Sequence, residues 1–300
     1  MNQRVIITGG SGYIGRKLVS TLKDHYEIVV LSRTPQRHTT AGAQVVGWDG
    51  KTAQGWGQLA DGAFAIINLA GENIGAKLWT RSRKEAILNS RLGAGRAVVE
   101  AVRTAAVKPQ VLIQSSGIGY YGSAPQPVTE ESPAGHDFPA SVCKAWEACT
   151  AEVEALGVRR VVTRTAVLID PKGDALGRML IPFKLFVGGP LGDGKQHFPW
   201  IHPADDIAAV RFLMENENAR GAYNVIAPNS ATNAEFARAL GRVLRRPSFM
   251  PAPAFALRLA LGELSAIVLE GQNAKPAKLE AAGFKFQFPD VERALEDLLK

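Results

Sequence analysis

TGGSGYIG, residues 8–15, follows the apolar run Val5-Ile6-Ile7 near the start of this 300-residue chain. Its glycines fit the spacing G-x-G-x-x-G from Gly10 and G-x-x-G-x-x-G from Gly9. Between a strand and a helix, this spacing lets the backbone approach a dinucleotide pyrophosphate at the helix N-terminus. The alternative is a plain glycine-rich turn. The cofactor contacts that the run predicts are Gly9, Gly10, Ser11, Gly12, Tyr13, Ile14 and Gly15.

The first half of the chain alternates short apolar runs with helical segments. The runs are Val5–Ile7, Ile28–Leu31, Gln44–Val46, Ala65–Ile67, Val111–Ile113 and Val161–Val162, and long helices are expected over 79–106 and 140–156. Continuously apolar strands are typical of sheets covered on both faces. The alternation therefore predicts an α/β fold of the Rossmann type, a doubly wound parallel sheet.

The end of the second strand, Ser32-Arg33, carries a base where NAD sites usually carry an acid. No acidic residue occurs between Glu27 and Asp49, and an Arg can bind a ribose 2′-phosphate in a bidentate way. The pattern favours NADP over NAD, with Arg37 and His38 as possible helpers. A solvated surface position for Arg33 is the alternative.

The fourth strand ends in Asn68-Leu69-Ala70-Gly71-Glu72. Small residues at this place allow the chain to pass close to a cofactor ribose, so all five are expected to contact the cofactor. An ordinary exit from a strand into a loop is the alternative.

Composition excludes several classes of protein. The net charge is +7, yet no run of five basic residues appears, which argues against a nucleic-acid partner. The most apolar late stretch, residues 254–269, is short and contains two charges, so no membrane span is expected. Cys143 and Cys149 lie about 9 Å apart along one expected helix, too far for a disulfide. With no secretory leader and no metal-binding motif, we expect a cytoplasmic protein without a metal.

The strand–helix rhythm ends near Thr165, which divides the chain into a nucleotide-binding domain, 1–165, and a smaller, mainly helical substrate-side region, 166–300. In this second region the glycine-rich segment 188–194 is a candidate lid. Thr232 and Glu235 form a capping box that opens a helix. The alternating run Phe284–Phe288 predicts a short strand, and a final helix is expected from Asp290.

The motifs together resemble the short-chain dehydrogenase/reductase superfamily, in its extended, epimerase-like branch. The resemblance rests on residues 8–15, Asn68–Gly71, Ser115-Ser116-Gly117 and the Gly-Tyr-Tyr-Gly run at 119–122. It extends to Phe-Pro-Trp-Ile-His at 198–202 and to a small C-terminal domain at about 248–295, as in the atypical "epimerase family" proteins. The resemblance covers nearly the whole chain and implies a Rossmann fold that binds NADP.

Members of this superfamily typically use Ser, Tyr and Lys, the last two as Tyr-x-x-x-Lys on one helix. Here only Tyr13 has a lysine four residues on, Lys17, and that pair lies in the nucleotide turn. A cysteine, Cys143, stands near the expected lysine position, and Lys144 would point about 100° away around the helix. The catalytic candidates that the resemblance implies are Ser116, Tyr121 and Cys143.

Two further residues, Arg91 and His202, stand at positions where the resemblance bears on their role. Arg91 stands where typical members have an Asn, and it is expected to bind cofactor phosphate or a substrate anion, with a surface ion pair as the alternative. His202 precedes a helix and is expected to be structural.

Two functions remain open from the sequence. The first is an NADP-dependent, epimerase-like oxidoreductase acting on a small molecule held between the sheet and residues 173–205. The second is a non-catalytic NADP-binding protein that senses redox state, which the missing Tyr-x-x-x-Lys pair favours.

Overall fold

The computed structural model describes residues 3–37 and 41–300, so His38 lies outside the described residues. Its centre is a seven-stranded sheet with the order β11-β7-β5-β4-β1-β2-β3, in which every neighbouring pair is parallel. The strands are β1 (Arg4–Thr8), β2 (Glu27–Ser32), β3 (Gln44–Gly47), β4 (Ala65–Asn68), β5 (Val111–Gly117), β7 (Arg159–Thr165) and β11 (Gly221–Val225). The doubly wound parallel sheet is thereby confirmed.

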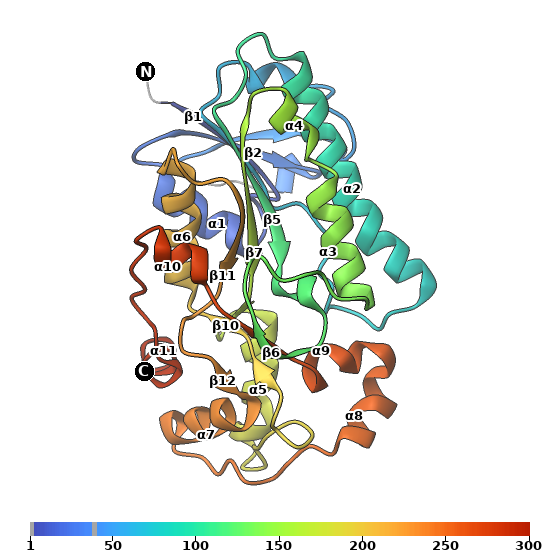
Figure 1. Ribbon diagram of the computed structural model, residues 1–300, viewed down its shortest axis with the longest axis vertical. Helices are drawn as coiled ribbons and strands as arrows, with labels where there is room; N and C mark the ends of the chain where they lie inside the picture. The colour runs from blue at the N-terminus through green and yellow to red at the C-terminus, as the bar shows by residue number, and fades with distance from the viewer. Residues whose placement is uncertain (1–2, 38–40) are drawn as a thin grey trace.

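Helices cover both faces of the sheet (Figure 1). On one side lie α1 (Tyr13–Leu22) and α6 (Pro203–Glu215); on the other lie α2 (Arg81–Thr104), α3 (Phe138–Ala148) and α4 (Glu152–Ala155). Side chains alternate along each strand, so Val5 and Ile7 pack with Leu18 of α1, while Ile6 packs with Val98 of α2. This double burial explains why the strands read as continuously apolar runs.

The order of strands reverses at β1, which pairs with β2 on one side and β4 on the other. In open α/β sheets, ligands bind at such a switch point, beyond the carboxyl ends of the strands. The turn at residues 9–12 leaves β1 at this edge, and Leu69 follows β4 beside it.

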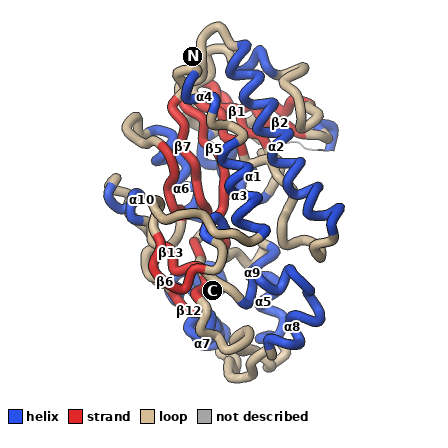
Figure 2. The backbone as a smooth tube through the Cα atoms, turned by 45° about the vertical axis from the view of Figure 1, so that its right-hand side comes forward, coloured by secondary structure: helices blue, strands red, loops and turns tan. Residues whose placement is uncertain are grey.

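A second group of elements lies beyond this edge (Figure 2). Its helices are α5 (Asp174–Lys184), α7 (Asn233–Leu244), α8 (Ala254–Leu261), α9 (Ala266–Leu269) and α11 (Val291–Leu299). The short helix α10 (Ala277–Ala281) instead packs beside β11 of the central sheet. Short paired strands complete the second group: β8 (Val167–Leu168) with β10 (Trp200–Ile201), β9 (His197–Phe198) with β12 (Ala231–Thr232), and β6 (Ala124–Val128) with β13 (Gln272–Ala274). Single 3₁₀ turns are η1 (Pro35–Arg37), η2 (Gly57–Ala60), η3 (Ile118–Tyr121) and η4 (Gly262–Ser265).

Residues on both sides of position 165 share the sheet and its core. β11 belongs to the central sheet, and Leu279 and Phe284 pack in the same buried cluster as Val5 and Ile7. A separate cluster forms between α5, α7 and α11, around Leu180, Phe236 and Leu295.

The expected strand at Phe284–Phe288 is wrong, although its alternation is real. Phe284 is buried and packs edge-on against Phe286, with ring centroids 5.0 Å apart. The backbone N–H groups of Gln287 and Phe288 donate to the carboxylate of Asp205, at 2.8 and 3.0 Å, instead of to a neighbouring strand. A side chain thus supplies the acceptors that a ladder would have supplied.

The structure also bears on other expectations about helices and cysteines. The helix expected over 140–156 is two helices, α3 and α4, with Cys149 capping the first. The capping box of Thr232 and Glu235 is confirmed. Cys143 and Cys149 are both free thiols. Among the helices that the structure describes, none is long and apolar enough to cross a membrane.

Candidate functional site

A cleft of about 1380 Å³ opens at the carboxyl edge of the sheet. One wall is built from the glycine turn and the ends of β2, β3, β4, β5 and β7. The opposite wall comes from α5, α8, η4 and α9. A single small ligand usually occupies about 300–1,000 Å³, so the cleft has room for a dinucleotide and a second molecule.

Each glycine of the turn is there for its own physical reason. Gly9 has a φ of +68°, a left-handed conformation that favours glycine. A Cβ on Gly10 would lie 2.8 Å from the Val30 side chain, and one on Gly15 would lie 2.4 Å from Gly10 Cα. Gly10 does not line the cleft; its role is to let the turn pack on β2.

Gly12 differs from these three, because a Cβ there would meet only the Gly9 carbonyl oxygen, at 3.1 Å. It caps helix α1, whose first turn carries no acidic residue and whose N-terminus receives no hydrogen bond from a capping side chain. The first N–H groups of α1 are therefore available to an anion in the cleft. The turn fits a dinucleotide pyrophosphate, with Gly12 leaving open the space into which it would fit.

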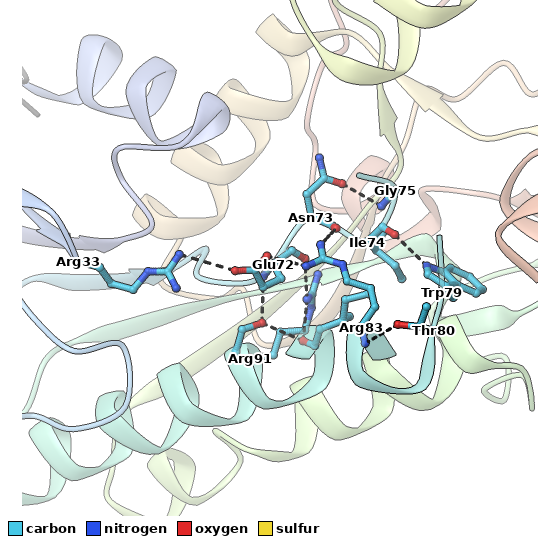
Figure 3. A network of polar contacts seen from close by, with 11 residues as sticks. Arg33, Glu72, Asn73, Ile74, Gly75, Trp79, Thr80, Arg83 and Arg91 are labelled. Carbon is cyan, nitrogen blue, oxygen red and sulfur yellow. Dashed lines mark hydrogen bonds and ion pairs between the residues drawn. The ribbon is translucent and has the colours of Figure 1, made fainter. Parts of the chain in front are cut away.

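Arg33, directly after β2, lies beside Glu72, an acidic residue that is distant from it in the sequence. Its Nη2 is 3.8 Å from Glu72 Oε1, and its side chain is 69% exposed. Glu72 is bound more closely by Arg83, with Nη1 2.9 Å from Oε2 (Figure 3). This hydrogen bond lowers the pKa of Glu72. The sequence has no acidic residue close to Arg33 along the chain, but in the folded protein Glu72 lies beside it.

Further residues line this end of the cleft that were not predicted from the sequence. Trp48, Asp49, Gly50 and Lys51 follow β3 and line the cleft. The Asp49 carboxylate accepts the Lys51 N–H at 2.7 Å and so shapes a turn. The sequence could have predicted these residues, because β3 is the parallel neighbour of β2 and the carboxyl ends of parallel neighbours lie at the same edge of the sheet. Ser32 also lines the cleft, and its Oγ accepts the Thr34 N–H at 3.2 Å.

The residues after β4 divide into two groups. Asn68 is fully buried and does not line the cleft. Its amide accepts from Thr8 Oγ1 at 2.6 Å and donates to Gln114 Oε1 at 2.9 Å, which ties β1, β4 and β5 together. The expectation of a cofactor contact from the Asn68 side chain is corrected to this role. Leu69, Ala70, Gly71 and Glu72 do line the cleft.

Arg91 of α2 is buried, so its reading as a surface ion pair is wrong. Its Nη1 donates to the carbonyl oxygens of Glu72 and Ile87, at 2.9 and 3.0 Å, and its guanidinium lies 4.5 Å from the centre of the Trp146 ring. Burial lowers the pKa of Arg91 to about 10. It lines the cleft and supports the loop that carries Glu72.

Ser116 of β5 lines the cleft and joins a buried ion pair. Its hydroxyl donates to Glu147 Oε1 at 2.7 Å. Arg164 of β7 binds both oxygens of the same carboxylate, each at 2.9 Å. Glu147 comes from α3, so three elements meet at this group, and no spacing along the chain predicted it.

Tyr121 and Cys143 do not reach the cleft, which corrects their assignment as catalytic candidates. The Tyr121 hydroxyl is buried, donates to Asn224 Oδ1 at 2.8 Å and accepts from Arg164 Nη1 at 3.0 Å. The Cys143 thiol donates to the Gly117 carbonyl oxygen at 3.6 Å. Burial raises the pKa of Cys143 to about 11, which keeps the thiol protonated at neutral pH.

Tyr13 and Lys17 share a partner outside the nucleotide turn. The Tyr13 hydroxyl hydrogen-bonds to Asp170, and Lys17 Nζ lies 3.3 Å from Asp170 Oδ2. Tyr13 lines the cleft. Its hydroxyl is bound to a carboxylate, and burial is the main cause that raises its pKa, so it is a weak proton donor.

His202 caps the start of α6. Its Nδ1 accepts the Ala204 N–H at 3.1 Å at the start of α6, and its ring stacks on Phe288 with centroids 3.8 Å apart. Within the described residues, no group of three or more His, Cys, Asp or Glu side chains could hold a metal ion.

Comparisons with known proteins place these features in context. The sequence pattern of the NAD dependent epimerase/dehydratase family matches residues 5–226, and that of a domain of unknown function, DUF1731, matches residues 252–298. The chain is 37% identical to epimerase family protein SDR39U1 of Bos taurus, covering 99% of both chains. It is 36% identical to epimerase family protein YfhF of Bacillus subtilis, covering 98% of this chain and 97% of that one.

Solved structures resemble the whole chain. The human epimerase family protein SDR39U1, crystallised with NADPH, has a TM-score of 0.86 and 32% identity and covers 99% of both chains. A UDP-glucuronic acid 4-epimerase from Bacillus cereus has a TM-score of 0.78 at 14% identity, covering 99% of this chain and 98% of that one, which is a likeness of fold.

Proposed function

This chain belongs to the NAD dependent epimerase/dehydratase family, and we propose that it binds NADP(H) in the cleft and reduces a carbonyl compound there. The observation that carries the proposal is the uncapped N-terminus of α1, which faces the cleft from the glycine turn with Arg33 and Lys51 nearby. The human relative that was crystallised with NADPH supports the same cofactor.

The residues present fit the parts of a dinucleotide. The backbone of 9–12 and the first N–H groups of α1 would hold the pyrophosphate. Arg33 and Lys51 are cations at the end of the cleft where an adenosine 2′-phosphate would bind, and Glu72 is already neutralised by Arg83. Leu69, Ala70 and Gly71 line the cleft after β4 and would lie along the cofactor, where Ala70 and Gly71 bring little side-chain bulk.

When bound, a reduced nicotinamide supplies a hydride to a carbonyl carbon, while the carbonyl oxygen gains a proton. Several hydroxyls line the cleft, and we assign the contact with the carbonyl oxygen to that of Ser116, at the carboxyl end of β5. It would rotate about its Cβ–Oγ bond, leave Glu147 and donate a hydrogen bond to the carbonyl oxygen. Glu147 remains satisfied, because Arg164 binds both of its oxygens. Solvent in the cleft supplies the proton that completes the alcohol.

Ser116→Ala tests this role in a single-turnover assay. NADPH-loaded protein is mixed with a panel of carbonyl and quinone substrates, and NADPH oxidation is followed by absorbance. We expect the variant to lose about 10²- to 10³-fold in rate, as when one donor to a developing oxyanion is removed. NADPH affinity should be unchanged, because the hydroxyl contacts the second molecule.

Tyr121→Phe is the matched control, since it removes a hydroxyl from the same buried network without touching the cleft. Its turnover should equal that of the unmodified protein, and its melting temperature should fall. Equal turnover in all three proteins would exclude Ser116 as the donor.

A second candidate function is non-catalytic binding of NADP to sense redox state. It is favoured because Tyr121 and Cys143 do not line the cleft. The same assay separates the two proposals. Tight NADPH binding without oxidation by any member of the panel is the result expected of the sensor.

A further inference from the structure

The wall of the cleft that faces the sheet is apolar over most of its length. It is formed by Met179, Pro182, Leu257, Leu261, Leu264 and Ile267, from α5, α8, η4 and α9. Of the described residues in 254–269, none that lines the cleft is charged or polar, although Arg258 and Glu263 lie in the same segment. The side chains at this wall can offer dispersion contacts and few hydrogen bonds.

The same segment is unusual because its apolar residues do not form a core. Neither α8 nor α9 contains a single buried residue. Leu257 and Leu261 lie one turn apart and face the cleft, whereas Leu259 on the same helix is 87% exposed. An apolar helix without a fully buried residue gains limited stability from its side chains, unless a ligand covers them.

The segment is nevertheless held in place. Lys84 of α2 forms an ion pair with Glu263 of η4, and Gln196 Nε2 donates to the Val268 carbonyl oxygen at 3.0 Å. The wall is thus attached to both halves of the molecule around the cleft, which suits a surface that must keep its position against a ligand.

Among the described residues that line this half of the cleft, the cationic side chains are one just before α5 and one within it. Lys172 and Arg178 line the cleft there, next to Asp174, whose carboxylate accepts from Asn73 Nδ2 at 2.7 Å. A nucleotide-linked sugar carries a diphosphate and many hydroxyls, and burying them against the α8–α9 wall would leave them without partners. The wall therefore disfavours that class of substrate.

We propose that the substrate half of the cleft binds a carbonyl compound with a long apolar chain, whose chain lies against α5, α8, η4 and α9 while its carbonyl reaches Ser116. This inference rests on the proposed function and gives a role to the C-terminal segment at 252–298. The polar end of the substrate is small, and most of its binding energy comes from apolar contact.

The test is equilibrium binding of methyl ketones with straight chains, from butanone to decanone, to NADPH-loaded protein by calorimetry. Each added CH2 that is buried should tighten binding about fourfold. UDP-glucose, measured in the same way, should bind more weakly than decanone. Affinity that is flat along the ketone series, or UDP-glucose binding tighter than decanone, would overturn the proposal.

The double variant Leu257→Gln with Leu261→Gln locates the effect on the wall. Both positions lie on a helix without buried residues, so the fold should be kept. We expect decanone to bind at least about tenfold more weakly and butanone to be little affected. Leu259→Gln, on the outer side of the same helix, is the matched control and should bind decanone as the unmodified protein does. Equal decanone affinity in the double variant and the control contradicts the assignment of the wall.

NADPH affinity is measured on every sample and distinguishes a failure of the proposed function from a failure of the apolar substrate alone. If the unmodified protein does not bind NADPH, the proposed function is refuted. Normal NADPH binding with a flat ketone series would refute the apolar substrate alone.

Discussion

Arg33 and Glu72 form a loose, exposed pair in which the acid is held mainly by Arg83. Exposed ion pairs are worth about 0–1 kcal/mol, so the Arg33 guanidinium can leave Glu72 at small cost. A 2′-phosphate, with its larger charge and several acceptor oxygens, is the stronger partner. The acid that lies beside Arg33 in space therefore does not remove the preference for NADP.

We predict that Arg33→Ala weakens NADPH binding about tenfold to a hundredfold, the usual worth of a hydrogen bond to a charged group. NADH binding should change little, because NADH lacks the phosphate. Calorimetry with both nucleotides measures the difference. Arg81→Ala, whose side chain is 95% exposed in a pair with Glu85 and does not line the cleft, is the control. Equal losses for both nucleotides would contradict the role of Arg33.

Asp206 is a second residue whose behaviour follows from its surroundings. It lies in the first turn of α6, is buried, and its Oδ2 has no hydrogen-bond partner among the described residues. Burial raises the pKa of Asp206 from 3.8 to about 7, against an opposing hydrogen bond with Thr165. The folded protein thus binds this proton more tightly than the unfolded chain does. The stability gained is present below pH 3.8 and is lost as the pH rises toward 7.

Asp206→Asn should remove this dependence. Each unit between the folded and unfolded pKa is worth about 1.4 kcal/mol. The free energy of unfolding of the variant, relative to that of the unmodified protein, should therefore be higher at about pH 8 than at about pH 5. The free energy of unfolding, measured in urea at both values, gives the answer. Asp24→Asn, at an exposed position, is the control. A variant that gains equally at both values would show that Asp206 titrates normally.

At the scale of elements, the two glycines at the start of α1, Gly12 and Gly15, have different roles. Gly15 allows the helix to lie against the turn, since a Cβ there would collide with Gly10. Gly12 has ordinary backbone angles, φ −73° and ψ 179°, and leaves space at the uncapped helix N-terminus. We expect packing to require the first, and a bound anion to require the second.

Gly12→Val should therefore abolish NADPH binding while the melting temperature stays close to that of the unmodified protein. Gly15→Val should instead lower the melting temperature strongly or prevent folding. Fluorescence titration with NADPH and thermal unfolding measure the two effects. Normal NADPH binding by folded Gly12→Val would mean that the turn serves the fold alone.

At the scale of the whole molecule, the C-terminal segment is joined to the sheet rather than appended to it. β13 pairs with β6, and Leu279 of α10 is fully buried in the cluster that includes Val5, Ile7 and Val161. The two halves therefore share a core on one side of the sheet, and the cleft lies between them.

We expect Leu279→Ala to destabilise the protein by about 2–5 kcal/mol, the usual cost of such a cavity. Because the core is shared, calorimetry should show one unfolding transition that moves to lower temperature as a whole. Leu259→Ala, at an exposed position, should leave the transition in place. A second transition that stays at the original temperature would show that the nucleotide-binding half unfolds by itself.

Local patterns in the chain were enough to predict six of the seven strands of the central sheet, the glycine turn and the nucleotide edge of the sheet. Double burial makes strands such as β1, β2 and β4 largely apolar, and the turn needs its glycines within eight residues, so both signals lie close together in the sequence. The capping box of Thr232 and Glu235 was readable for the same reason.

The contacts that distinguish this site join residues that are far apart in the chain. Glu147 meets Ser116 and Arg164, Glu72 meets Arg33, and Asp205 accepts from the backbone at Gln287. Tyr121 belongs to a matching family motif, yet its hydroxyl is turned to Asn224 in the core. Which side chains face the cleft depends on how strands and helices pack in three dimensions, and a motif of a few residues does not contain that information.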